Sequence, residues 1–177
     1  MRQMRLGRVA GLELSFTWAA VWGSLGLGLL IAGIGVAAFQ WSIGQAAGLA
    51  LLGIVLHWAG EFVHQLGHAL AAARAGYPMA GVRFGVLALL SASLYPPDEP
   101  ALPGRIHIRR ALGGPLLSLL LALVIGGLWL ALRERSPLAH GVLLAAALEN
   151  ALVFGLGALV PLGFNDGSTL VRWWGRD

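Results

Sequence analysis

The feature that most constrains this chain is a long run of residues without a single charge. Between Trp18 and Gln45 there is no Asp, Glu, Lys, Arg or His. The apolar part of this run is longer than the roughly 20 residues that a helix needs to cross a bilayer. It is also too long for the apolar core of a secretory signal peptide, which has about 7 to 15 residues. We therefore interpret it as a membrane span.

Three further apolar stretches of similar length predict an all-α polytopic membrane protein with four transmembrane helices. The predicted spans cover residues 18–39, 46–73, 111–132 and 138–160 of a single membrane-embedded domain, 1–177. The composition agrees, since 11% of the residues are charged, against about 25% in soluble domains. Residues 81–94 are apolar but too short to span, and their β-forming start predicts a re-entrant segment or a β-hairpin.

The basic residues indicate the topology of these spans. All of them are arginines, and they gather at the ends of the apolar stretches, at Arg2, Arg5, Arg8, Arg74, Arg83, Arg105, Arg109, Arg110, Arg133, Arg135, Arg172 and Arg176. The positive-inside rule then predicts a multi-pass cell-membrane protein with both termini and the central loop, 74–110, in the cytoplasm. Arginines that mark topology are not a nucleic-acid footprint, so we expect membrane lipid and no nucleic acid as a partner.

The second predicted span carries a stripe of ionisable side chains. At 100° per residue, His57, Glu61, His64 and His68 fall within an arc of roughly 60° on one helix face. Ionisable groups inside a membrane are costly and usually mark function. His64 and His68, one turn apart, can present two imidazoles to one metal ion. The alternative is that these histidines only form hydrogen bonds with neighbouring helices.

A carboxylate follows the fourth predicted span, at Asp166. With the topology above, the second and fourth spans run in the same direction, so their C-terminal ends lie on the same side of the membrane. His64, His68 and Asp166 then reach a similar depth and supply three ligands, which is the composition of a catalytic zinc site. The chain has no cysteine to offer a thiolate. The alternative role for Asp166 is the N-cap of a short helix that starts near Gly167.

These residues lie in motifs that resemble those of the site-2 proteases, the zinc metalloproteases that cut helices inside membranes. The similar segments are His64-Gln-Leu-Gly-His68-Ala-Leu-Ala-Ala (family HELGHALAA), Pro161 with Asp166-Gly167 (family NxxPxxxxDG) and the glycine-proline motif Gly113-Gly114-Pro115. The resemblance implies one zinc ion per chain on His64, His68 and Asp166. It also implies a strand in residues 81–94 that receives an unwound substrate helix, with a transmembrane helix as substrate or client. The chain resembles a minimal form of the family.

Two positions depart from the family pattern. The family's general base is the Glu after the first histidine, and here that position is Gln65. A primary amide cannot take a proton from metal-bound water. The family's Asn three residues before the proline is Ala158 here, and the loss of one such hydrogen-bond donor commonly lowers the rate by about 10² to 10³. As written, the chain is therefore expected to be inactive or weakly active in peptide hydrolysis.

Nearby polar residues leave the role of the general base open. Glu61 precedes Gln65 by one helical turn and is either a substitute base, a partner that orients a histidine, or part of an interhelical hydrogen bond. The same alternatives hold for Glu149 and Asn150 in the fourth span.

Three functions follow from these observations. The first is an intramembrane zinc metalloprotease, impaired by Gln65 and Ala158. The second is a pseudoprotease that keeps the fold and binds transmembrane helices of client proteins without cutting them. The third is a small transporter that uses the histidine and glutamate stripe as a relay, which explains the buried charges but not the motifs at Gly113 and Asp166.

Overall fold

The computed structural model describes residues 3–132 and 136–176, and it divides into two compact units. One unit comprises Met1–Ala59 and Ala80–Leu94, and the other comprises Gly60–Met79 and Tyr95–Asp177. Helix α2 (Ile43–Arg74) begins in the first unit and ends in the second. Arg2, Arg133 and Arg135, on which the predicted topology partly depends, lie outside the described residues.

Four helices are long and apolar enough to cross a membrane, which confirms the predicted polytopic class. They are α1 (Trp18–Phe39), α2, α3 (Gly104–Leu132) and a fourth helical stretch, Leu138–Leu159. The fourth stretch consists of α4 (Pro137–Glu149), a π-helical turn η1 (Asn150–Leu156) and a 3-10 turn η2 (Gly157–Leu159). Helix α3 begins before residue 111, where the predicted span starts. The first turns of α3 contain arginines, and the span was predicted from apolar residues alone.

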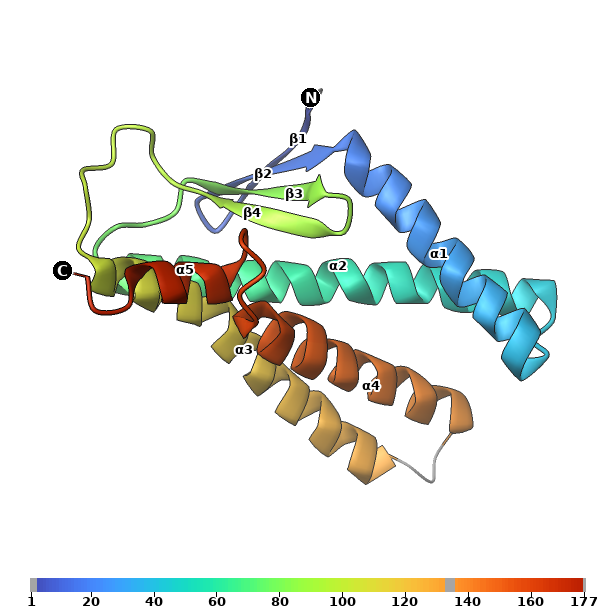
Figure 1. Ribbon diagram of the computed structural model, residues 1–177. Coiled ribbons are helices and arrows are strands. Elements are labelled where there is room, and N and C mark those ends of the chain that lie inside the picture. The colour runs from blue at the N-terminus through green and yellow to red at the C-terminus, as the bar shows by residue number, and fades with distance from the viewer. Residues whose placement is uncertain (1–2, 133–135, 177) are drawn as a thin grey trace. The chain divides into compact units, whose positions relative to one another are not determined.

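The first unit contains a four-stranded sheet in the order β1-β2-β3-β4, seen in Figure 1. The strands are β1 (Gln3–Val9), β2 (Leu12–Thr17), β3 (Gly81–Leu87) and β4 (Leu90–Leu94). Strands β1 and β2 are antiparallel, β2 and β3 parallel, and β3 and β4 antiparallel. The hairpin predicted for residues 81–94 is confirmed, and the sheet is larger than predicted because β1 and β2 extend it.

Local sequence explains the sheet. Strand β2 buries Leu12 and Leu14 on one face, as an alternating pattern requires. The β1–β2 hairpin turns at Ala10 and Gly11, both with positive φ, which is the conformation of a tight two-residue hairpin loop. Trp58 of α2 packs edge-on against Phe16 of β2, with ring centroids 5.4 Å apart. This sheet and the first part of α2 thus share one apolar core.

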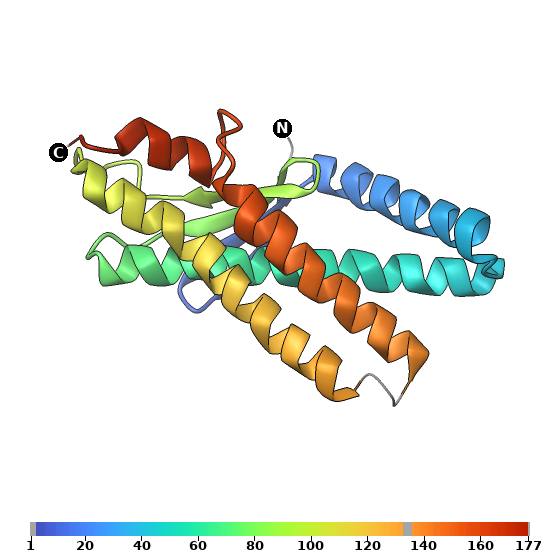
Figure 2. The same cartoon turned by 60° about the horizontal axis from the view of Figure 1, so that its bottom comes forward.

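The second unit packs α3 against α4 and against the last helix, α5 (Asp166–Trp173). Figure 2 shows α4 running beside the second half of α3. The His107 ring at the start of α3 stacks on Trp173 of α5, with ring centroids 4.2 Å apart. A Cβ at Gly167 would meet the backbone carbonyl of Leu159, so α5 begins close to the end of the fourth span. This close approach places the residue before it, Asp166, beside the helical core.

Candidate metal centre

Two histidines from the second half of α2 form the base of the candidate site. His64 and His68 lie one helical turn apart and are 6% and 4% exposed. Their Nε2 atoms are 3.0 Å apart, and the ring planes are nearly perpendicular. Two ring nitrogens this close require a proton or a cation between them.

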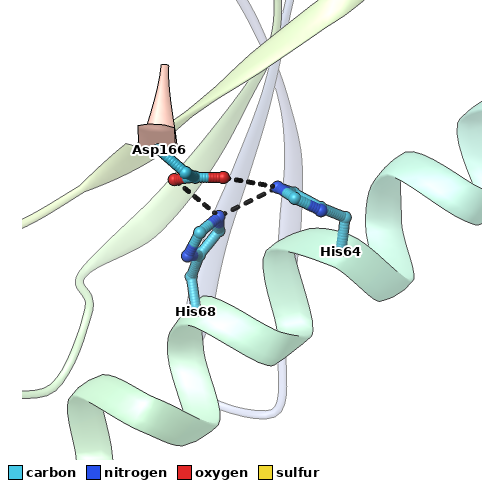
Figure 3. Close-up of side chains that lie close together, drawn as sticks. All are labelled: His64, His68 and Asp166. Carbon is cyan, nitrogen blue, oxygen red and sulfur yellow. Dashed lines mark hydrogen bonds and ion pairs between the residues drawn. The ribbon is translucent and has the colours of Figure 1, made fainter. Parts of the chain in front are cut away.

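Asp166, the first residue of α5, supplies the third group. Figure 3 shows its carboxylate facing both imidazoles. Its Oδ2 lies 3.2 Å from Nε2 of His64, and its Oδ1 lies 3.4 Å from Nε2 of His68. Burial alone would raise the pKa of the Asp166 carboxyl, but the two neighbouring imidazoles hold that pKa below its ordinary value of 3.8. The carboxyl is therefore ionised at neutral pH.

The alternative interpretation of Asp166 as an N-cap is wrong. The N-cap of α5 is Asn165, whose side chain accepts a hydrogen bond from the backbone nitrogen of Ser168. The Asn165 amide also donates to the carbonyls of Ala158 and Val160. Asn165 therefore performs the capping and ties α5 to the preceding turn, which leaves the Asp166 carboxylate to face the histidines.

Each histidine is oriented through its other ring nitrogen. Nδ1 of His64 lies 3.2 Å from Oγ of Ser118, and Nδ1 of His68 lies 2.7 Å from the backbone carbonyl of Arg110. A carbonyl oxygen only accepts, so Nδ1 of His68 carries the proton and, in the neutral ring, Nε2 carries a lone pair. Such partners fix the tautomer and the direction of a metal-binding imidazole.

Glycines of α3 make the space in front of the histidines. A Cβ at Gly114 would meet Nε2 of both His64 and His68. One residue earlier, Gly113 lies against Gly67 of α2 so closely that a Cβ on either would meet the backbone of the other. The glycine-proline motif therefore lets α3 approach α2 and leaves the histidine nitrogens uncovered.

The donor set fits a zinc ion. The lone pair of His68, the Nε2 of His64 and a carboxylate converge, and a cation offsets their mutual repulsion. Zinc binds imidazole nitrogen at about 2.0–2.1 Å in tetrahedral geometry, so its ligand atoms lie about 3.3 Å apart. The three separations here are 3.0, 3.2 and 3.4 Å. Among the described residues, His64, His68 and Asp166 form the cluster able to hold a metal.

Other residues of the predicted stripe have different surroundings. His57 belongs to the first unit, where its Nε2 lies 2.9 Å from the carbonyl of Leu89 in the β3–β4 turn. Glu61 and Gln65 are buried, 3% and 4% exposed, but Glu61 is not part of the three-residue cluster. The candidate roles of Glu61 and Gln65 stay predictions.

The two polar residues considered in the fourth span also differ from each other. Asn150 is 3% exposed and starts the π-helical turn, a feature that often occurs at functional sites. Its Nδ2 donates to the carbonyl of Ala146, while its Oδ1 is buried without a hydrogen-bond partner among the described residues. Glu149 precedes that turn and has an interaction partner.

Sequence reasoning missed Ser118 and Arg110 as partners of the histidines. Ser118 is fully buried. It is also the one hydroxyl-bearing residue between positions 111 and 132, and this isolated polar residue in an apolar span could have indicated its role. Arg110 acts through its backbone carbonyl, which no side-chain pattern reveals. The role of Gly114 could be recognised only from the positions of α2 and α3.

Comparison with known proteins supports the fold. The chain is similar in structure to the site-2 protease from Methanocaldococcus jannaschii, with a TM-score of 0.67 and 19% sequence identity. The match covers 97% of this chain and 70% of that chain. No protein-family model matches the chain, and no curated protein matches it in sequence. An identity this low shows the fold alone, so the chain has a site-2-protease-like fold.

Proposed function

We propose that this chain is a membrane-embedded zinc-binding protein of the intramembrane metalloprotease type, whose peptide hydrolysis is impaired by Gln65 and Ala158. The observation that supports it is the convergence of His64, His68 and Asp166 at the spacing of zinc ligands. When bound, zinc would polarise a substrate carbonyl and lower the pKa of a bound water.

The surrounding residues would hold and orient the metal ligands. The Ser118 hydroxyl and the Arg110 carbonyl fix the two imidazole rings, and Asn165 fixes the start of α5. Burial of both histidines restricts access of bulk water, which strengthens electrostatic interactions inside the site. These orienting contacts are made by residues other than the one at position 65.

The impairment would lie in proton transfer and in binding of the substrate carbonyl. The Gln65 amide can donate and accept hydrogen bonds but cannot take up a proton and pass it to the leaving amine. The Ala158 methyl cannot donate a hydrogen bond to a substrate oxygen. A buried carboxylate one turn away, Glu61, is a group on α2 able to carry a proton instead.

The test separates metal binding from hydrolysis. Elemental analysis of the detergent-purified chain should find one zinc ion per chain. The same analysis of the His64→Ala, His68→Ala double variant should find none. With metal bound, Gln65→Glu should raise cleavage of single-span membrane substrates by about 10² to 10⁴, the usual contribution of a general base. Adding Ala158→Asn should raise it further. Equal zinc content in the double variant would refute the metal site.

The variants also test Glu61 as the working base. That role predicts cleavage by the unaltered chain, abolished by Glu61→Gln. Glu61→Gln should lower only metal affinity if Glu61 orients a histidine.

The second candidate function is a pseudoprotease that binds transmembrane helices without cutting them, and Gln65 favours it. It predicts that the unaltered chain retains intact single-span proteins through purification. It also predicts that no variant at positions 61, 65 or 158 cleaves them when zinc is bound.

A further inference from the structure

An open groove runs between the end of α2 and the first half of α3, both within the second unit. Its volume is about 430 Å³, within the range of about 300–1,000 Å³ usual for small-molecule sites. Its lining includes the side chains of Leu70, Arg74, Arg109, Leu112, Leu116 and Leu120. The groove is thus basic at one end and apolar along its length.

The α3 residues of the groove form one stripe along that helix. Arg109, Leu112, Leu116 and Leu120 follow each other at intervals of three or four, so they share one helix face. Leu70 and Arg74 do the same on α2. Leu70, Leu116 and Leu120 are about half exposed, with 48%, 59% and 56% of their surface accessible. The stripe is therefore not covered by the rest of the unit.

Among the described residues, the two arginines of the groove have no acidic partner. Arg110, the neighbour of Arg109, is 4% exposed and pairs with Glu99 at 2.5 Å. Within residues 3–132 and 136–176, neither Arg74 nor Arg109 has an ion pair, and both are exposed. Arg74 is the last residue of α2, and Arg109 lies in the first turns of α3. The two positive charges therefore lie at the polar ends of these apolar helices.

We propose that this groove binds one anionic phospholipid. The headgroup phosphate would lie between the guanidinium groups of Arg74 and Arg109, and an acyl chain would follow Leu112, Leu116 and Leu120 along α3. Arginine forks match phosphate oxygens well, and basic pockets between transmembrane helices are known to take anionic headgroups. The proposal does not depend on the metal centre or on proteolysis.

Size and charge favour a lipid over a protein helix. An α-helix about 10 Å wide with a pitch of about 5.4 Å fills roughly 420 Å³ in a single turn. A groove of 430 Å³ thus holds about one turn of a partner helix but a long stretch of a narrow acyl chain. The two arginines also favour negative charge at one end, which a phosphate supplies and an apolar helix does not.

The test compares lipids that differ only in headgroup charge. The full chain in neutral detergent is titrated with phosphatidylglycerol or with phosphatidylcholine of the same acyl chains, and bound lipid is counted by native mass spectrometry. Each arginine near an anionic headgroup contributes roughly fivefold, so Arg74→Gln with Arg109→Gln should weaken phosphatidylglycerol binding about 30-fold. The matched control, Arg105→Gln with Arg172→Gln, removes the same charge from exposed positions outside the groove.

Two further arms check the acyl chain. Leu116→Trp, which fills the apolar part without changing charge, should reduce phosphatidylglycerol binding while zinc content stays unchanged. Glycerol 3-phosphate, which has the anion but no acyl chain, should not compete. Equal binding of both lipids, equal loss in the control variant, or full competition by glycerol 3-phosphate would overturn the proposal. The proposal would also be overturned if these leucines were required for a dimer, or for binding of a single-span peptide, and phosphatidylglycerol did not displace that partner.

Discussion

Substitution of Gly114 by alanine should destroy the metal site while leaving the helices intact. A Cβ at this position would lie 2.6 Å from Nε2 of His64, and ordinary van der Waals contact begins at 3.4 Å, so this nitrogen must move by about 0.8 Å. It would also collide with Nε2 of His68. Metal–ligand distances tolerate only about 0.2 Å.

The expected loss of zinc affinity follows from this displacement. Mutating a residue that merely orients a ligand lowers metal affinity by about 10- to 100-fold. Gly114→Ala moves the ligating nitrogens themselves, so the loss should be at least about 100-fold. Competition with a chromophoric zinc chelator, on detergent-purified protein, measures it.

A matched control lies in the same helix. Gly126 is also in α3, and a Cβ there would meet nothing within 4 Å. Gly126→Ala should leave zinc affinity unchanged and should slightly favour the helix, because alanine is a better helix former than glycine. If Gly114→Ala is folded, as judged by its circular dichroism, and binds zinc as tightly as the unaltered chain, then these histidine nitrogens are not the ligands.

Three more outcomes are expected. Ser118→Ala should lower zinc affinity about 10- to 100-fold because His64 loses its orienting partner. The control Ser15→Ala removes a buried serine hydrogen bond in the other unit and should leave zinc affinity unchanged. Equal effects of the two variants would contradict the role of Ser118. The hydrogen bond from Arg110 holds the pKa of Glu99 below its ordinary value of 4.5, so the stabilisation is complete above pH 4.5 and is lost as the pH falls through the lowered pKa. Glu99→Gln should therefore lower Tm at pH 7 and should differ less from the unaltered chain in acid, and a pH-independent difference would refute this. Reporter fusions at the C-terminus and near Gln40 should report opposite sides of the membrane, and reporters on the same side would contradict the predicted topology.

Much of the helical fold was predictable from the sequence. Spans are set by local hydropathy, because a backbone in lipid must satisfy its hydrogen bonds within its own helix. All four predicted spans correspond to helices long enough to cross a membrane. Helix α3 begins before the predicted apolar span because Arg105, Arg109 and Arg110 continue the helix although they are not apolar.

The sheet was only partly predictable. The β3–β4 hairpin joins neighbouring residues and has its own local pattern, whereas β2 pairs with β3 across two intervening helices. Strand β1 has no buried face at all, so no alternation marks it. Pairing over such a distance depends on where α1 and α2 return the chain, and a short sequence window does not contain that information.

The candidate site divides in the same way. The sequence by itself determined that His64 and His68 share a helix face, because helical periodicity is local, and the motif around Asp166 suggested the third group. Only the tertiary structure decided that Asn165 caps α5, that Ser118 and the Arg110 carbonyl hold the two rings, and that Gly114 leaves room before them. The Asn165 cap is a local contact with Ser168. The contacts of Ser118, of the Arg110 carbonyl and of Gly114 with the histidines join residues 42 or more positions apart, and they exist only once α2 and α3 pack together.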